Sequence, residues 1–274
     1  MAVRLTLLAA MGLSTSMAVT SAPVVAQGLF DDDVIEVEVL PGWREAGMAH
    51  IAALRFTLDP GWKTYWRAPG DAGIPPYFDW QGSQNLVSVT PHFPVPDIFD
   101  QNGMRSIGYE NEVVIPLHLE RRSAAEPIYL QGMLQIGVCE EICIPAMLEI
   151  EAMLPPQGGA DSAIQAALAD RPMTEAEGRV GRVTCAVDAI ADGLALTMTA
   201  TMPPLSGAEA AAIETADPSV WVAEPSLNRS GNTLVARTEL VHVSQAPFAL
   251  DRSGVRMTVF GDSEAVEIVG CAAR

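Results

Sequence analysis

The sequence has few positively charged residues and few histidines. Its 274 residues include 16 Lys and Arg against 34 Asp and Glu, which gives a formal net charge of −18. Nucleic acids and anionic membrane surfaces repel such a chain, so we expect neither as a partner. The four histidines form no H-x3-5-H or H-E-x-x-H pattern. This argues against a zinc enzyme, and we expect no cofactor and no metal.

Beyond its N-terminus the sequence also lacks an apolar run of the ~20 residues that a membrane-spanning helix needs. Residues 1–26 place Arg4 before an apolar run and end in small residues at Ala26. This order is typical of a secretory signal peptide that is cleaved near Ala26. A retained membrane anchor is the alternative, although the run is short for one. We therefore expect an exported, periplasmic protein, in which disulfides can persist.

Short strand-like segments fill residues 27–155, and turn residues separate them. Apolar and polar residues alternate with a period of two in the first segment, as in a half-buried strand. The sequence predicts strands over residues 34–40, 50–58, 85–93, 112–120, 127–139 and 146–154. Many short strands without long amphipathic helices indicate an all-β sandwich.

A change in composition marks residues 156–172 as a linker. It begins with Pro and Gly, continues as an Ala-rich segment after Asp161, a candidate helix N-cap, and ends at Pro172, so we expect one short helix. Residues 173–274 then predict a second, smaller β-sandwich domain. Its predicted strands are residues 181–190, 194–202, 219–225, 232–243, 255–261 and 265–271.

The four cysteines fall into two groups. Cys185 lies in the first predicted strand of the second domain, and Cys271 ends the last one, as the fourth residue from the C-terminus. A disulfide between them would tie the first and last strands together. The chain-entropy model gives such a closure about 4–5 kcal/mol of stabilisation, so we predict a structural disulfide.

The other two cysteines, Cys139 and Cys143, stand four apart in the sequence GVCEEICIPA. A bridge between them closes a loop of only five residues, so it constrains the unfolded chain much less. Spacing and compartment leave three interpretations open: a redox-active pair, a structural staple, or a metal site, for instance for Cu(I). Glu140 and Glu141 would raise the pKa of both thiols, which favours a relay over an aggressive nucleophile.

Three sequence blocks resemble a known family. They are GWKTYWRAPGDAGIPP at residues 61–76, GYENEVVIPLHL at residues 108–119, and GVCEEICIPA at residues 137–146. In this order they are similar to the N-terminal periplasmic domain of the DsbD/ScsB transmembrane thiol reductases, over roughly residues 31–155. The resemblance implies an immunoglobulin-like sandwich. It also implies a cysteine pair that receives electrons from a thioredoxin-like domain and passes them to periplasmic oxidoreductases or isomerases.

The resemblance assigns these redox roles to Cys139 and Cys143. By analogy, partners attack Cys143 and Cys139 resolves the mixed disulfide. The family shields its pair with a cap loop, which would correspond to Asn102–Glu110 with Tyr109 as the candidate shield. Tyr65 and Trp66 would wall the site, although ordinary sandwich packing explains all three aromatic residues equally well.

The family's multi-helix membrane domain and thioredoxin-like domain have no counterpart in these 274 residues. We therefore expect a separate reductant, such as a membrane thiol reductase, and a periplasmic thioredoxin-like oxidoreductase or disulfide isomerase as partner. The predicted function is periplasmic thiol–disulfide interchange through Cys139 and Cys143. The alternative is a non-enzymatic binding or copper-handling module whose cysteines are structural or ligate the metal.

Overall fold

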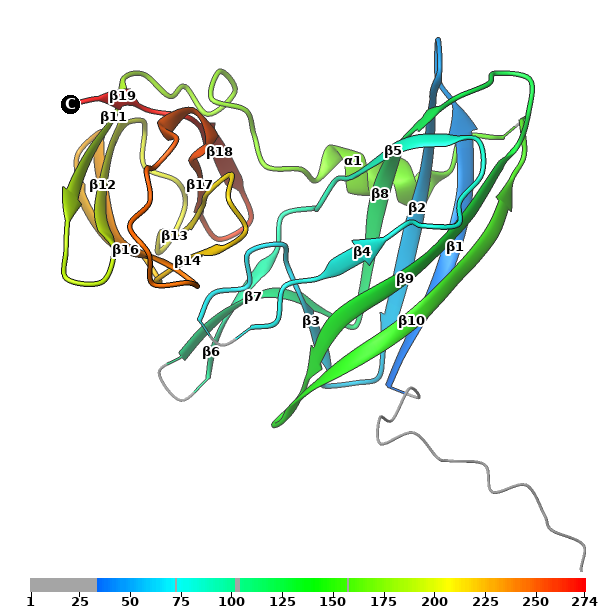
Figure 1. Ribbon diagram of the computed structural model, residues 1–274, viewed down its shortest axis with the longest axis horizontal. Coiled ribbons are helices and arrows are strands. Elements are labelled where there is room, and N and C mark those ends of the chain that lie inside the picture. Colours follow the sequence, from blue (N-terminus) through cyan, green and yellow to red (C-terminus); the bar gives the residue numbers. More distant parts are fainter. Residues whose placement is uncertain (1–33, 72, 102–103, 157) are drawn as a thin grey trace, which may run out of the picture.

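Two β-units joined by a segment with one helix make up the protein (Figure 1). The computed structural model describes residues 34–71, 73–101, 104–156 and 158–274. The predicted signal peptide, residues 1–26, lies outside the described residues. The all-β fold class, with an immunoglobulin-like sandwich followed by a second, smaller sandwich, is confirmed.

The N-terminal unit, residues 34–154, is a sandwich of two sheets. The first sheet has the strand order β1-β2-β8-β5, and the second has β10-β9-β3-β7-β6, with β4 paired to β9. The bounds are β1 Ile35–Arg44, β2 Ala49–Leu58, β3 Lys63–Tyr65, β4 Tyr77–Asp79, β5 Leu86–Pro91, β6 Asp97–Gln101, β7 Met104–Glu110, β8 Glu112–Arg121, β9 Ile128–Cys139 and β10 Cys143–Leu154.

The core of this unit follows from the period-two pattern of its strands. Along β10, Ala146, Leu148 and Ile150 are buried. Met147, which lies between two of them, and Cys143, the first residue of the strand, are exposed. Successive side chains of a strand point to opposite faces, so a single strand separates a core face from a solvent face. The same alternation determines which side chains near the cysteines lie on one face of the sheet and can contact each other.

Helix α1, Ser162–Ala169, confirms the predicted short helix. The carboxylate of Asp161 accepts hydrogen bonds from the first-turn amides of the helix, as an N-cap residue does. Ile164 is fully buried against Leu40, Ile51 and Ala53 on the outer face of the first sheet. The strands beneath α1 are therefore covered on both faces. Within the described residues, no helix is long and apolar enough to cross a membrane.

The C-terminal unit, residues 183–273, also contains two sheets. One has the order β14-β16-β12-β11-β19 with β15 paired to β16, and the other has β13-β17-β18. The bounds are β11 Val183–Ala189, β12 Leu194–Thr201, β13 Ala210–Glu214, β14 Val220–Val222, β15 Ser226–Ser230, β16 Thr233–His242, β17 Arg256–Phe260, β18 Ala265–Val269 and β19 Ala272–Ala273, with a 3-10 turn at Arg252–Gly254.

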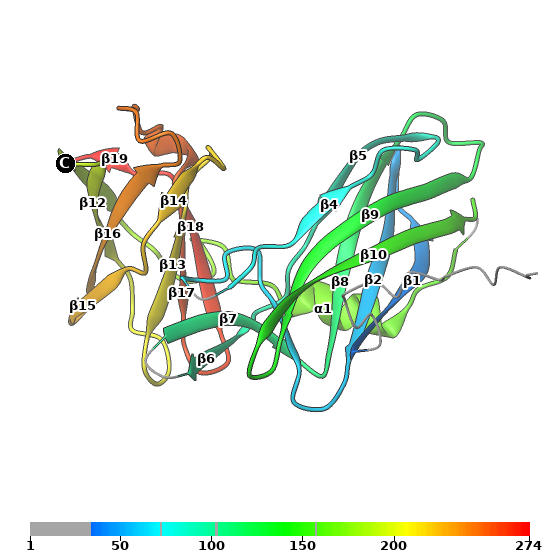
Figure 2. The same cartoon turned by 60° about the horizontal axis from the view of Figure 1, so that its bottom comes forward.

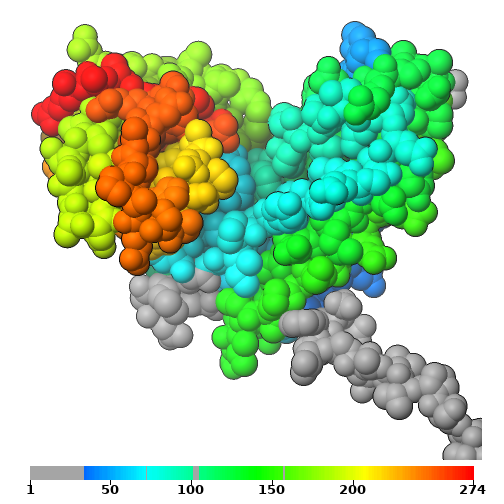
Figure 3. All heavy atoms as spheres, viewed as in Figure 1, coloured from blue at the N-terminus to red at the C-terminus, as the bar shows by residue number. Residues whose placement is uncertain are grey.

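The two units touch each other and share part of a core. Ala210, Ala212, Phe260 and Ala265 of the C-terminal unit belong to the same buried cluster as the interior of the N-terminal sandwich. The rotated view places β6 and β7 beside β13 and β17 (Figure 2). In the space-filling view the contact runs through atoms coloured cyan, with a notch between the units above it (Figure 3).

One predicted loop is a strand in the structure. The stretch Asn102–Glu110 was expected to be a cap loop, but Met104–Glu110 is strand β7, paired with β3 and β6. Asn102 and Gly103 lie outside the described residues. Strands β3, β4, β6, β13, β15 and β19 were also not predicted, because they have only two to five residues and few alternating positions to show a period.

Candidate redox site

The two cysteines of the N-terminal unit face each other across a tight hairpin. Strands β9 and β10 pair in antiparallel register over twelve positions, and the last pair is Cys139 with Cys143. Only Glu140, Glu141 and Ile142 form the turn. The two cysteines are joined by a disulfide, with their Cα atoms 4.2 Å apart. Because the loop between them is so short, the bond constrains the unfolded chain less than Cys185–Cys271 does.

The two sulfurs differ in their access to solvent. Cys139 is 2% exposed, whereas Cys143 at the start of β10 is an exposed residue. Ile142 beside it is 74% exposed. Cys143 is therefore the more accessible residue of the pair.

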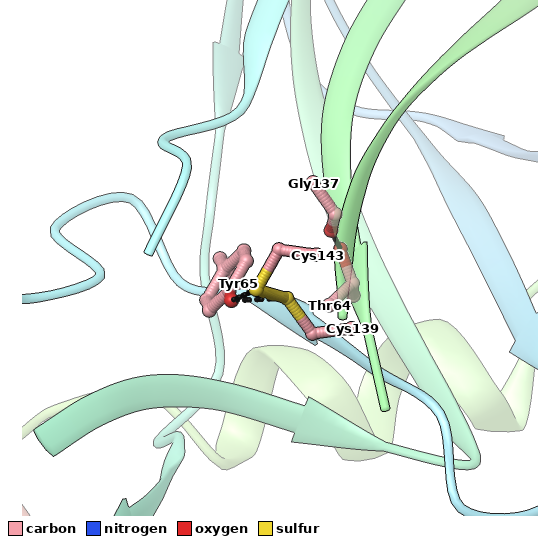
Figure 4. The surroundings of a disulfide bond; sticks show 5 residues. All are labelled: Thr64, Tyr65, Gly137, Cys139 and Cys143. Carbon is pink, nitrogen blue, oxygen red and sulfur yellow. Dashed lines mark hydrogen bonds between the residues drawn. A yellow bond between two sulfur atoms is a disulfide. The ribbon is translucent and has the colours of Figure 1, made fainter. Parts of the chain in front are cut away.

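Tyr65, the last residue of β3, lies against the disulfide (Figure 4). Its hydroxyl oxygen is 2.6 Å from Sγ of Cys139 and 3.0 Å from Sγ of Cys143. A disulfide sulfur carries no proton, so the hydroxyl is the donor in these two contacts. Burial raises the pKa of Tyr65, which keeps the phenol protonated at neutral pH.

Close packing fixes the ring of Tyr65. A Cβ atom built on Gly73 or on Gly137 would come within 2.9 Å of ring carbons of Tyr65, so larger residues at either position would displace the ring. Next to it, the hydroxyl of Thr64 donates a hydrogen bond to the carbonyl of Gly137, 2.9 Å away. The ring therefore has one position, and that position directs its hydroxyl to the sulfurs.

Trp66 and Tyr109 do not flank the disulfide, which corrects their assignment as site walls. Tyr109 pairs with Thr64 across β3 and β7, so its side chain points to the face opposite that of Tyr65. It lies in the core and donates a hydrogen bond to the carbonyl of Pro94, 2.9 Å away. Trp66 follows Tyr65 directly and is fully buried, with its ring against Phe260 of the C-terminal unit.

Lys63 is a site residue that the sequence analysis missed. It pairs directly with Cys139 in the β3–β9 ladder, and it is only 4% exposed. Its ammonium nitrogen lies 4.5 Å from the ring centroid of Phe99, a cation–π contact. One signal in the sequence could have pointed to it, because Lys63 is the sole lysine among 274 residues. It places a positive charge on the face that carries Cys139.

The second pair of cysteines also forms a disulfide. Cys185 on β11 and Cys271 before β19 are bonded, with their Cα atoms 5.6 Å apart and 86 positions between them in sequence. Cys185 is 1% exposed and belongs to the core of the C-terminal unit. Among the described residues, no group of three or more His, Cys, Asp or Glu side chains is arranged to hold a metal ion.

A solved structure resembles most of the described fold. The N-terminal periplasmic domain of ScsB from Proteus mirabilis superposes with a TM-score of 0.65 and 23% identity, over 88% of this chain and 94% of that chain. A marsupial T cell receptor aligns with 9% identity over 88% of this chain and 98% of its own, but its TM-score of 0.17 carries no argument. The first likeness shows a common fold. No curated protein matched the chain.

A family model gives the assignment of the N-terminal unit. The model of the N-terminal region of thiol:disulfide interchange protein DsbD matches residues 34–155. This match spans the complete sandwich from β1 to β10, including the Cys139–Cys143 hairpin and Tyr65. Residues 34–155 therefore form a domain of the DsbD N-terminal family of thiol:disulfide interchange proteins.

Proposed function

We propose that the protein relays electrons in the periplasm by thiol–disulfide interchange at Cys139 and Cys143. The observation that carries this proposal is the asymmetry of the disulfide. Cys143 is exposed, Cys139 is buried, and the hydroxyl of Tyr65 lies within hydrogen-bond distance of both sulfurs. Exchange requires an accessible sulfur to be attacked and a stabilised sulfur to leave.

Reduction of the pair begins at the exposed sulfur. A thiolate of a reduced partner attacks Sγ of Cys143, forms a mixed disulfide and breaks the bond to Cys139. Sγ of Cys139 leaves with the bonding electrons as a thiolate, which accepts the hydrogen bond of Tyr65. Lys63, opposite Cys139, adds favourable positive charge on the same face. The partner's second thiolate then attacks the partner sulfur that is bonded to Cys143. This step forms a disulfide within the partner and releases Cys143, so that the pair is left as a dithiol.

Oxidation of the dithiol runs the same steps in reverse with a second partner. The thiolate of Cys143 attacks the partner's disulfide, and one partner sulfur leaves as a thiolate. Cys139 then attacks Sγ of Cys143, which expels the partner's other sulfur and restores the Cys139–Cys143 bond. Two electrons and two protons pass to the partner in each cycle.

A partner must bring its own cysteine into contact with Cys143. We propose a periplasmic thioredoxin-like oxidoreductase or disulfide isomerase as one partner, and a membrane thiol reductase as the electron donor. Ile142 offers such a partner an apolar contact directly beside Cys143. We further propose cleavage of a signal peptide near Ala26, a redox domain at residues 27–155, a linker at 156–172 and a second domain at 173–274.

Competition between the two disulfides tests this function. Under graded dithiothreitol, we expect Cys139–Cys143 to open before Cys185–Cys271, because Cys143 is exposed, whereas the more accessible member of the second pair, Cys271, is only partly exposed. Alkylation of the freed thiols followed by mass mapping would give the order directly. If both pairs open together, the pair is structural, and if added Cu(I) protects the reduced pair, the copper-handling alternative gains support.

Replacement of Tyr65 tests the role of its hydroxyl. We expect Tyr65→Phe to slow the opening of Cys139–Cys143 about tenfold, because the departing thiolate loses a hydrogen bond to a charged group. Stopped-flow reduction by dithiothreitol would measure the rate. Tyr129→Phe is a matched control, since Tyr129 lies on the same strand β9 but bonds Glu151 at the other end of the hairpin. Equal rates for Tyr65→Phe and the control would contradict the role.

A further inference from the structure

The residues after β3 connect the disulfide to the C-terminal unit. Tyr65 contacts both sulfurs, while the next two residues, Trp66 and Arg67, point to the other unit. Because Tyr65 and Trp66 are joined by a single peptide bond, a shift of the backbone at Trp66 or Arg67 also moves Tyr65. The position of Tyr65 therefore depends on what holds Trp66 and Arg67.

Trp66 packs into the C-terminal unit. Its ring is fully buried and meets the ring of Phe260 on β17 edge to face, with centroids 5.3 Å apart and planes at 81°. Such aromatic pairs stabilise beyond the area they bury. On its other side, the guanidinium carbon of Arg67 lies 4.2 Å from the centroid of the Trp66 ring. The indole is thus held between a side chain of each unit.

Arg67 binds all three strands of the small C-terminal sheet. Its Nε donates to both carboxylate oxygens of Glu214 on β13, at 3.1 Å each. Its Nη2 donates to Glu267 on β18 at 2.5 Å and to the hydroxyl of Thr258 on β17 at 3.4 Å. Because the strand order is β13-β17-β18, this one side chain spans the sheet.

These ion pairs are partly removed from water. The side chains of Arg67, Glu214 and Glu267 are 18%, 22% and 28% exposed. Burial raises the pKa of Glu214, and the positive charge of Arg67 opposes that rise. A charge in such a place needs its partner, because an unpaired buried charge is strongly unfavourable. Arg67 is therefore held more firmly than a residue in a surface ion pair would be.

A second connection runs through the loop after Arg67. Ala68, Pro69 and Gly70 line a cavity of about 520 Å³ whose other wall belongs to the C-terminal unit. Gly73 of the same loop also lines this cavity and packs against the ring of Tyr65. The C-terminal unit thus borders the loop that closes one side of the tyrosine.

From these contacts we propose that the C-terminal unit is a positioning element for the redox site. It holds Arg67 and Trp66, and through them it keeps the Tyr65 hydroxyl in hydrogen-bond distance of the two sulfurs. Arg67 is the positioning residue, and Glu214 and Glu267 are its anchors. This inference rests on the proposed function. It gives Glu214 and Glu267, more than 70 positions after the cysteines, a role in the redox site.

The double variant Glu214→Gln/Glu267→Gln tests this proposal. It keeps the shape of both anchors but removes their charges, so Arg67 loses its ionic partners. We expect Cys139–Cys143 in the full chain to open about threefold more slowly with dithiothreitol, a fraction of the effect of removing the Tyr65 hydroxyl. On the Tyr65→Phe background the same double variant should have no further effect, because the coupling acts through that hydroxyl.

Two further variants make the result specific. Arg67→Lys keeps the charge but cannot bridge both carboxylates, so it should slow opening in the same direction and remains informative if the double variant folds poorly. Glu209→Gln is the matched control. It removes an ion pair with Arg229 inside the C-terminal unit in which Arg67 takes no part, and should leave the rate unchanged.

The outcomes separate this inference from the proposed function. An unchanged rate in both interface variants, with wild-type Cys139–Cys143 still opening before Cys185–Cys271, would overturn the positioning role alone. Equal slowing with and without the Tyr65 hydroxyl would also overturn it, because the effect would then be general loosening. If the wild-type pair opens no earlier than Cys185–Cys271, the proposed function fails and this inference fails with it.

Discussion

Cys139→Ser is expected to accumulate a mixed disulfide between Cys143 and a partner protein, and Cys143→Ser is expected to accumulate at least about tenfold less. The mixed disulfide persists when the resolving thiol is absent. In Cys139→Ser the remaining sulfur is the exposed one, whereas in Cys143→Ser it is 2% exposed. Non-reducing gels of periplasmic extracts, from variants expressed with residues 1–26 intact, would show the adducts.

The double variant Cys139→Ser/Cys143→Ser is the control for this trapping experiment. It retains Cys185 and Cys271, so any adduct that it forms comes from the other disulfide. Stronger trapping by Cys143→Ser than by Cys139→Ser would reverse the two roles. Absence of adducts in both single variants would favour a structural or copper-binding pair.

Loss of the second disulfide is expected to have the largest effect on stability. Cys185→Ser or Cys271→Ser should lower the free energy of unfolding of the C-terminal unit by about 2–5 kcal/mol, because the bond closes a long loop in the unfolded chain. Calorimetry of the full chain under oxidising conditions would follow the transition. Opening of Cys139–Cys143 should continue in both variants.

The double variant at Cys139 and Cys143 again gives a matched comparison. The chain-entropy model predicts about 2 kcal/mol for its loop of five residues, less than half of the value for the long loop. The β9–β10 ladder pairs eleven further positions beyond the cysteines, so we expect the hairpin to persist without the bond. An unchanged melting temperature after loss of Cys185–Cys271 would argue against its structural role.

The sequence predicted the longer strands and the setting of the cysteines because these depend on local patterns. Alternation gave the paired segments around Cys139 and Cys143, and the capping residue Asp161 gave the helix. The direction of the aromatic side chains was not predictable from residue type. It follows from the register of β3 with β7, and a three-residue strand such as Lys63–Tyr65 has no visible period.

The contact between the units also had no sequence signal. Arg67 and Glu214 are 147 positions apart, and nothing in either surrounding segment indicates the other. The burial of Lys63 is a similar case: its status as the sole lysine makes it stand out in the sequence, but no local pattern predicts that a charged residue will be buried. Such long-range pairs depend on tertiary packing of the complete chain.

The register of the cysteine hairpin has a kinetic consequence. The β9–β10 ladder extends from Cys139 opposite Cys143 to Ile128 opposite Leu154. Its backbone hydrogen bonds are separate from the S–S bond. After reduction, the two thiols remain tethered at facing positions, so each meets the other at a high effective concentration. When Cys143 holds a partner in a mixed disulfide, the thiolate of Cys139 is therefore placed to attack Sγ of Cys143 and expel the partner's sulfur as a thiolate, so we expect this mixed disulfide to be short-lived whenever Cys139 is free.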